Sequence, residues 1–330
     1  MTTMPPAIEP GAPSESFNVA RFVARYGAIL VLIALIVFFS VMKPAVFLDK
    51  DNFINILSQS SLGAIIAMGL TFVLVCGEFD LSIGYVASLG GILATWLLGQ
   101  HGWPMAASAV VAVAVAAAVG LVNGILVTVV GINALIATLG VGTIVLGVNY
   151  AITGGVPIAI DNDSFLNFTV NKLWGVPYPV YVLLVLAMVL WVLLNKTEVG
   201  YSMQAVGGNR IAAEFSGIRV GRVRRTAFVI AAMCAALTGV LLASQSGSAT
   251  VDGGQSYLLP AFAAAFFGSA VLRDGQFHII GTLLGIFTVQ VGFNGITLIG
   301  ISSYYQFVFQ GSLLILAVGA GALARRTAER

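Results

Sequence analysis

The sequence predicts an all-α polytopic membrane protein with about ten transmembrane helices. Three observations predict this class. The chain is 59% hydrophobic and only 8% charged, its mean hydropathy is +1.01, and long apolar runs recur along its whole length. An ordinary soluble domain carries roughly 25% charged residues. A water-soluble core cannot hide this much apolar surface, so most of the chain must lie in a bilayer.

Counting about 20 apolar residues for each crossing gives ten expected spans. They cover residues 26–42, 54–76, 81–98, 105–129, 134–152, 177–194, 226–245, 257–272, 279–300 and 304–323. We expect residues 1–20, which are polar and rich in proline, to be a disordered cytoplasmic tail. A single transmembrane domain then covers residues 21–325, and residues 326–330 form a second cytoplasmic tail.

The basic residues predict the orientation. Lys and Arg near span ends are retained on the cytoplasmic side of a membrane. One cluster precedes the first span, a second lies in segment 195–225, and a third follows the last span. Ten spans place all three clusters on the same side, whereas eight or nine spans would place one cluster outside. We therefore expect both termini to be cytoplasmic.

A faint internal repeat links the two halves of the chain. The tripeptide Asn-Gly-Ile occurs at 123–125 and again at 294–296, and an Asp-x-x-x-x-Tyr pattern begins at both Asp80 and Asp252. This pairs spans two to five with spans seven to ten. A shift of five spans inverts the second copy in the membrane, as in many transporters. The alternative is a chance similarity between glycine-rich apolar segments.

Segment 195–225 is a long polar stretch between the sixth and seventh expected spans. It holds five arginines, and Gly207, Gly208 and Gly217 lie in it beside the alanine pair Ala212–Ala213. Small residues at this density indicate a short helix with surfaces for close approach rather than a flexible tether. We expect a partner to dock on this segment.

The segment Cys-Gly-Glu-Phe-Asp-Leu-Ser-Ile-Gly at 76–84 places two carboxylates between apolar spans. A charge near hydrocarbon costs a few kcal/mol. One interpretation makes Asp80 the N-cap of the third span, with Ser82 helping and Glu78 in a loop near water. The other has the flanking glycines break the helix, so that its polar backbone lines a cavity. Both can hold at once.

Catalytic, metal-binding and cofactor-binding motifs are not found in the sequence. It lacks the phosphate-binding pattern G-x-x-x-x-G-K-[ST], so we expect no ATP hydrolysis by this chain. The expected spans also lack a series of Asp, Glu, Lys or His residues that would mark a proton- or sodium-coupled carrier. A transporter of this kind must draw its energy from a partner.

Four segments carry a family resemblance: CGEFDLSIG, NGILVTVVGINALIATLG, GYSMQAVGGNRIAAEFSGI and NGITLIGISSYYQ. They resemble permease subunits of ribose-type monosaccharide ABC importers, within the superfamily of branched-chain amino acid permeases. The resemblance runs from about Ile54 to Val318. It implies a ten-span permease domain in the bacterial inner membrane and a second permease copy. It also implies an ATP-binding subunit with two nucleotide-binding domains, which would hold ATP and Mg²⁺, and an extracytoplasmic substrate-binding protein.

The resemblance also implies which residues dock on the ATP-binding subunit. The family's A-x-G-x-N-x-x-A-A pattern is followed by a glycine, and in this chain these positions are Ala205, Gly207, Asn209, Ala212, Ala213 and Gly217. The chain departs from the family at 76–79, where the common reading G-G-I-D-L-S becomes G-E-F-D-L-S. It departs again at 258–264, where an acidic run is replaced by apolar residues. These departures leave the expected fold intact and put the substrate in doubt.

We therefore expect the transmembrane permease subunit of an ATP-driven importer for a small sugar or polyol. Seven residues are candidates to line its pathway: Glu78, Asp80, Ser82, Asn123, Asn149, Gln290 and Asn294. Polar side chains within spans also serve as ordinary links between helices. The alternatives are a permease for branched-chain amino acids, nucleosides or a signalling furanose, a stand-alone channel or secondary carrier, and a membrane scaffold. We expect contact with membrane lipid and none with nucleic acid.

Overall fold

The computed structural model describes residues 19–269 and 275–328 of this chain, and helices dominate it. The long helices are α1 Val19–Met42, α3 Lys50–Val75, α4 Ile83–His101, α5 Met105–Ile125, α6 Ala134–Thr153, α8 Tyr178–Lys196, α11 Val220–Ser246, α13 Ile279–Leu298 and α14 Tyr304–Ala328. Three expectations lie partly outside the described residues: the tail at 1–20, the end of the span at 257–272 and the tail at 326–330.

Shorter elements connect the long helices. They are the α-helices α2 Pro44–Phe47, α7 Asp163–Val170, α9 Glu198–Gly208, α10 Arg210–Phe215 and α12 Leu258–Ser269, the π-helix η1 Leu126–Val130 and the 3₁₀-helix η2 Gly253–Tyr257. Two antiparallel pairs of two-residue strands complete the described chain: β1 Ile158–Ala159 with β4 Ser248–Ala249, and β2 Lys172–Leu173 with β3 Val176–Pro177. The predicted all-α class is confirmed.

Seven helical segments in the described chain are long and apolar enough to cross a membrane. They are α3, α4, α5 continued by η1, α6, α8, α11 and α13. Helices α1 and α14 contribute shorter apolar stretches, Tyr26–Met42 and Tyr304–Gly319. As described, α12 has 12 residues, which is short for a complete crossing. The protein is therefore a multi-pass membrane protein, as predicted, and the number ten stays a prediction.

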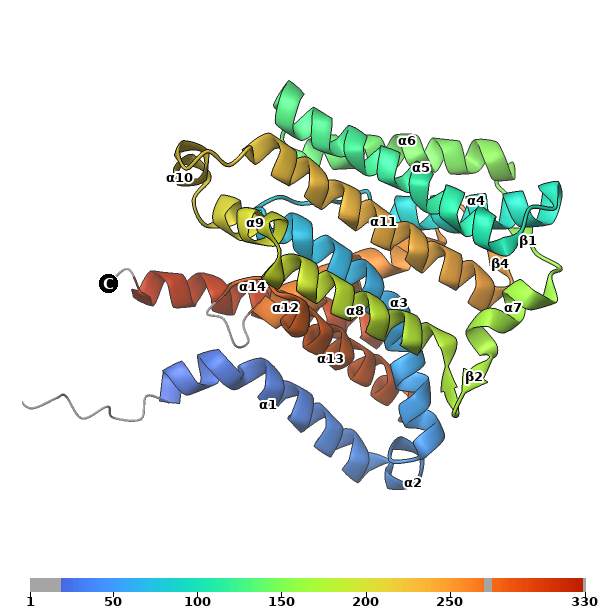
Figure 1. Ribbon diagram of the computed structural model, residues 1–330. Helices are drawn as coiled ribbons and strands as arrows, with labels where there is room; N and C mark the ends of the chain where they lie inside the picture. The colour runs from blue at the N-terminus through green and yellow to red at the C-terminus, as the bar shows by residue number, and fades with distance from the viewer. Residues whose placement is uncertain (1–18, 270–274, 329–330) are drawn as a thin grey trace, which may run out of the picture.

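The helices lie side by side in a bundle with two distinct ends (Figure 1). Helices α9 and α10 lie at one end together with the C-terminal end of α14, and we call this the α10 end. Helices α2 and α7 and the β2–β3 hairpin lie at the opposite end, the α7 end. Most of the elements outside the long helices thus gather at the two ends of the bundle.

Helices α3 and α11 form the centre of the bundle. Every residue of α3 from Ser60 to Val75 is buried, and α11 packs against α3, α4 and α5. Small residues permit this close approach. A Cβ atom on Gly239 of α11 would lie 1.7 Å from the carbonyl oxygen of Ala87 in α4, so only glycine fits there.

Equivalent helices of the two halves make equivalent contacts. Helix α3 packs against α12 and α13, and α11 packs in the same way against α4 and α5. Likewise α6 lies on α4 and α14 lies on α12. The pairs α3 with α11, α4 with α12, α5 with α13 and α6 with α14 are the pairs that the internal sequence repeat predicts.

Candidate functional site

The predicted docking segment 195–225 contains α9, α10 and the start of α11 at the α10 end of the bundle (Figure 1). The side chain of Asn209 caps α10 by accepting a hydrogen bond from the backbone N–H of Ala212 at 3.0 Å. Gly217 follows the helix with a φ of +83°, the left-handed conformation typical of a helix C-terminus. The sequence itself therefore fixes where α10 begins and ends.

The predicted docking residues differ in their exposure. Ala205, Asn209, Ala212 and Gly217 are exposed, whereas Ala213 is only 5% exposed. Ala213 therefore packs α10 onto the protein, while the other five members of the set, Gly207 included, have exposed positions.

Gly207 holds α9 against the end of α3. A Cβ atom at this position would lie 1.8 Å from the carbonyl oxygen of Val75, the last residue of α3. No side chain fits in that space. Gly207 is thus required for packing inside the protein, which its place in the docking pattern did not reveal.

Two large apolar side chains project from α10. Ile211 is 68% exposed and Phe215 is 89% exposed. They lie four residues apart, so they share one face of the helix. The small residues of this segment were predicted from the sequence, whereas Ile211 and Phe215 were not. The Ile-x-x-x-Phe spacing beside the alanine pair is the signal that could have found them.

Glu78 links α10 to the α3–α4 connection, which comprises residues 76–82. Its carboxylate forms ion pairs with Arg210 of α10 and Arg224 of α11, each at 2.5 Å. The Glu78 side chain is 9% exposed, that of Arg224 12% and that of Arg210 47%. Glu78 lies in a loop, as expected, but the expectation that it lies near water is wrong, because the residue is buried. The two guanidinium groups that contact the carboxylate replace water as its partners.

Asp80, Ser82 and Asn123 form a buried hydrogen-bonded group at the start of α4. The Asp80 Oδ1 atom accepts hydrogen bonds from the backbone N–H of Ser82 at 2.9 Å and from its hydroxyl at 2.6 Å. The Asn123 amide then donates to the Ser82 hydroxyl oxygen at 2.8 Å. Ser82 is the N-cap residue of α4, so Asp80 braces the cap from two residues earlier.

This buried group has unused hydrogen-bonding capacity. Asp80 is fully buried and Asn123 is 1% exposed. Among the described residues, neither the Asp80 Oδ2 atom nor the Asn123 Oδ1 atom has a hydrogen-bond partner. Burial away from water raises the pKa of the Asp80 carboxyl. The Oδ1 atom of Asp80 therefore supports the start of α4, and its Oδ2 atom makes no hydrogen bond to a described residue.

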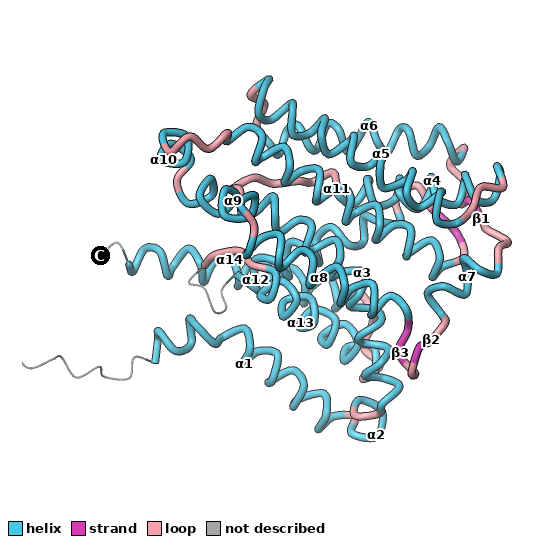
Figure 2. Tube along the Cα trace, in the orientation of Figure 1, coloured by secondary structure: helices cyan, strands magenta, loops and turns pink. Residues whose placement is uncertain are grey.

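Helix α4 begins inside the bundle rather than at its surface. Figure 2 shows the α3–α4 connection running beside α11 from near α9 toward the middle of the bundle. Asn123, which contacts Ser82, precedes the end of η1 at Val130 by two helical turns, about 10 Å. On its other side, Gly254 of η2 packs so closely on α4 that a Cβ would lie 2.4 Å from the Gly84 carbonyl oxygen. The two irregular connections therefore meet the first turn of α4.

Asn149 of α6 lies beside the same turn of α4. Its amide donates to the carbonyl oxygens of Tyr85 at 3.3 Å and Val251 at 3.0 Å. It therefore links α6 to α4 and to the connection before η2. No hydrogen bond joins it to Asp80 among the described residues.

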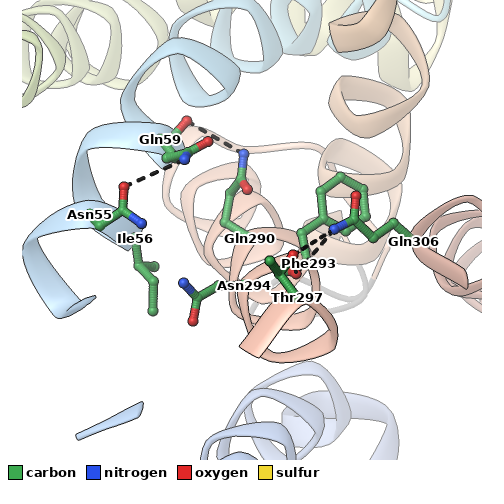
Figure 3. A pocket seen from close by; sticks show the side chains of 8 residues that line it. All are labelled: Asn55, Ile56, Gln59, Gln290, Phe293, Asn294, Thr297 and Gln306. Atoms are coloured by element: carbon green, nitrogen blue, oxygen red, sulfur yellow. Dashed lines mark hydrogen bonds between the residues drawn. The ribbon is translucent and has the colours of Figure 1, made fainter. Parts of the chain in front are cut away.

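Gln290 and Asn294 lie elsewhere, at a cavity of about 180 Å³ between α3, α13 and α14 (Figure 3). The cavity is lined by Asn55, Ile56 and Gln59 of α3, by Gln290, Phe293, Asn294 and Thr297 of α13, and by Gln306 of α14. Asn294 exchanges two amide hydrogen bonds with Asn52 of α3, at 2.8 and 3.2 Å. The seven predicted pathway residues therefore fall in three places. Gln290 and Asn294 line this cavity, Glu78 lies in the ion pairs beside α10, and the other four lie around the start of α4.

The described residues contain no group of three or more His, Cys, Asp and Glu side chains that could hold a metal ion. Cys76 and Cys234 are free, buried thiols. Amides and hydroxyls dominate the two polar regions, and such groups suit hydrogen bonding to a neutral solute.

The structure is a multi-pass helical bundle with an exposed short helix, α10, at one end and a polar cavity between α3, α13 and α14. Residues 52–318 match the family described as branched-chain amino acid transport system / permease component. Because this match covers most of the chain, the protein belongs to that permease family, which confirms the predicted resemblance.

Three relatives extend this finding. The chain is 33% identical to the ribose import permease protein RbsC of Haemophilus influenzae, over 92% of this chain and 95% of the relative. It is 31% identical to the D-allose transport system permease protein AlsC of Escherichia coli, over 92% and 93%. It is 33% identical to the galactose/methyl galactoside import permease protein MglC of H. influenzae, over 94% and 96%. No solved structure matches the chain.

Proposed function

We propose that this chain is the transmembrane permease subunit of an ATP-driven importer for a small neutral sugar or polyol. The names of the three relatives, which concern ribose, D-allose and galactose, support this substrate class. The cavity lined by amides and free of charged residues supports it independently. ATP and Mg²⁺ bind in a partner subunit, and this chain supplies the passage through the membrane.

The protein crosses the bacterial inner membrane ten times, with both termini in the cytoplasm. The seven membrane-spanning segments, together with α1, α12 and α14, account for ten crossings. The three clusters of basic residues then all face the cytoplasm, at the α10 end. The matching helix pairs of the two halves support an inverted repeat.

Helix α10 docks on an ATP-binding subunit with two nucleotide-binding domains. The observation that carries this proposal is the exposed apolar face formed by Ile211 and Phe215. Large apolar side chains that project from a capped helix at one end of a membrane protein fit a pocket on a partner. Ala205, Asn209 and Ala212 are exposed positions with short side chains, so a partner can approach the helix closely beside Ile211 and Phe215. Gly217 ends the helix.

The docking helix transmits motion through Glu78. When the ATP-binding subunit moves α10, Arg210 moves with it, and the ion pair carries the displacement to the α3–α4 connection. That connection leads directly to Asp80 and Ser82 at the start of α4. Helices packed through glycine and alanine can then shift against one another to alternate access.

Two further partners complete the transporter. An extracytoplasmic binding protein delivers the solute at the α7 end, opposite the docking helix. A second permease copy, identical or related, flanks the pathway. The family's expected assembly and the polar cavity support this arrangement.

Reconstitution tests the proposal. The permease is placed in proteoliposomes with its ATP-binding subunit and with ATP inside, and the binding protein and radiolabelled D-ribose, D-allose or D-galactose are added outside. We expect uptake of at least one sugar only when all components are present, and no uptake of L-leucine. Uptake without the ATP-binding subunit would identify a channel or secondary carrier. Uptake of L-leucine instead of a sugar would identify an amino acid permease.

A further inference from the structure

The cavity between α3 and α13 is built from two matching polar stripes. Asn52, Asn55 and Gln59 follow one another in α3 at intervals of three and four residues. Gln290, Asn294 and Thr297 follow one another in α13 at intervals of four and three. Residues at these intervals share one face of a helix, so each helix presents a single polar stripe. Figure 3 shows Gln59 and Gln290, from the two stripes, joined across the cavity.

These stripes include exposed polar side chains. Asn55, Gln59 and Thr297 are exposed although they belong to helices that cross the membrane. An amide exposed to hydrocarbon without hydrogen-bond partners costs several kcal/mol. An exposed polar stripe on such a helix is therefore more stable facing water or a polar solute than facing hydrocarbon.

The side chains around the cavity offer free hydrogen-bonding groups. The Gln59 amide donates to Asn55 Oδ1 at 3.4 Å, the Gln290 amide donates to the Gln59 carbonyl at 3.4 Å, and the Gln306 amide donates to Thr297 Oγ1 at 2.9 Å. In each of these three glutamines the side-chain N–H group therefore donates a hydrogen bond. No described residue donates a hydrogen bond to the side-chain oxygen of Gln59, Gln290 or Gln306.

We propose that this cavity is a binding site for a neutral solute that carries several hydroxyl groups, such as a monosaccharide. The free amide oxygens accept hydrogen bonds from sugar hydroxyls, and the free N–H of Asn55 donates to a sugar oxygen. Ile56 and Phe293 provide an apolar wall for the carbon framework. A volume of about 180 Å³ exceeds by far the space that one water needs. The site rests on the proposed transport function and locates its substrate.

The lining also determines which solutes are excluded. It contains no Asp, Glu, Lys, Arg or His. An amino acid would bring an ammonium and a carboxylate into a cavity with no opposite charge for either, which is unfavourable. The cavity therefore selects sugars and polyols over amino acids.

Thiol labelling tests the site without depending on transport. Both native cysteines are buried, so the unmodified protein should react little with a polar thiol reagent. Thr297→Cys places one reactive thiol in the cavity wall, and Ser164→Cys on α7 places one at an exposed position away from it. The labelling rate is measured on the full transporter, both without nucleotide and after trapping with vanadate, at increasing concentrations of D-ribose, D-galactose or L-leucine.

We expect a sugar to slow labelling of Thr297→Cys, and we expect L-leucine to leave it unchanged. Labelling of Ser164→Cys should not respond to any of them. Adding Gln290→Leu to Thr297→Cys removes hydrogen-bonding groups at nearly constant volume. It should raise the sugar concentration for half-protection about tenfold, the factor that corresponds to one lost hydrogen bond.

The failure of this proposal is distinguishable from failure of the transport function. The first outcome concerns a sugar that the reconstituted wild-type protein imports. If this sugar does not slow labelling of Thr297→Cys, either without nucleotide or after vanadate trapping, the solute binds elsewhere and the proposed site is wrong. If sugar protection is found and Gln290→Leu leaves the half-protection concentration unchanged, the assigned hydrogen bonds are wrong. If wild-type protein imports L-leucine and no sugar, the proposed function itself is wrong.

Discussion

Glu78 and Arg224 form an ion pair that is almost completely shielded from solvent, and it ties the α3–α4 connection to the first turns of α11. Helix α11 packs against α3, α4 and α5, so this contact joins the connection to the centre of the bundle. Arg210 of α10, the proposed docking helix, shares the same carboxylate. Glu78 thus lies between α10 and the interior of the bundle.

Replacing Arg224 with glutamine should destabilise the protein and impair transport. The substitution leaves the buried Glu78 carboxylate with only the partly exposed Arg210 as its partner. Removing one member of a buried pair typically costs about 3–5 kcal/mol, and the remaining partner reduces this cost. We expect a lower melting temperature in detergent and slower ATP-driven uptake in proteoliposomes.

Arg222→Gln is the matched control, because it removes the same charge from the same helix at an exposed position without an ion pair among the described residues. It should behave like the wild type. Equal melting temperatures and uptake rates for the two variants would show that the Glu78 ion pairs contribute nothing.

Gly207→Ala should destabilise the protein by roughly 1–3 kcal/mol, the usual cost of forcing an extra methyl group into packed structure. The added carbon would collide with the Val75 carbonyl oxygen and separate α9 from α3. The next residue provides the control, since a Cβ on Gly208 would meet nothing within 4 Å. Thermal melting of the two variants in detergent checks this, and a Gly208→Ala protein that melts earlier than Gly207→Ala would contradict the packing.

Asp80→Ala should lower stability more than Asp80→Asn. The Oδ1 atom of Asp80 accepts two hydrogen bonds from Ser82, which an asparagine oxygen can also accept and an alanine cannot. Leaving the Ser82 donors unpaired costs about 1–3 kcal/mol. Melting temperatures measure this part of the prediction.

Uptake then separates the two roles of Asp80. If the acid acts in the pathway, Asp80→Asn will slow uptake per folded protein while its melting temperature stays near that of the wild type. Normal specific uptake by Asp80→Asn would confine Asp80 to supporting the start of α4.

Hydropathy predicted the long apolar helices well, and seven of the ten expected spans coincide with helices long and apolar enough to cross a membrane. The expected spans at 134–152 and 279–300 agree with α6 and α13 to within two residues. The cap at Asn209 and the glycine after α10 could also be anticipated, since their effects are local. The expected span at 257–272 begins within one residue of α12, and its end lies outside the described residues.

The candidate sites were harder to predict because they depend on contacts between distant segments. Nothing near Glu78 in the sequence indicates that Arg210 and Arg224 lie against it. The role of Gly207 depends on the carbonyl group of Val75, which local patterns do not reveal. The stripe of Asn52, Asn55 and Gln59 was readable at helical spacing, but it becomes a site only opposite α13.

The most direct test of the account measures binding of the ATP-binding subunit to two permease variants. Phe215 on α10 and Trp174 in the turn between β2 and β3 are both 89% exposed, at opposite ends of the bundle (Figure 1). We predict that Phe215→Asp weakens co-purification of the ATP-binding subunit at least about thirtyfold in affinity, the effect of losing a central contact residue. Trp174→Asp should leave it unchanged. Wild-type affinity in the Phe215→Asp permease would contradict docking through α10.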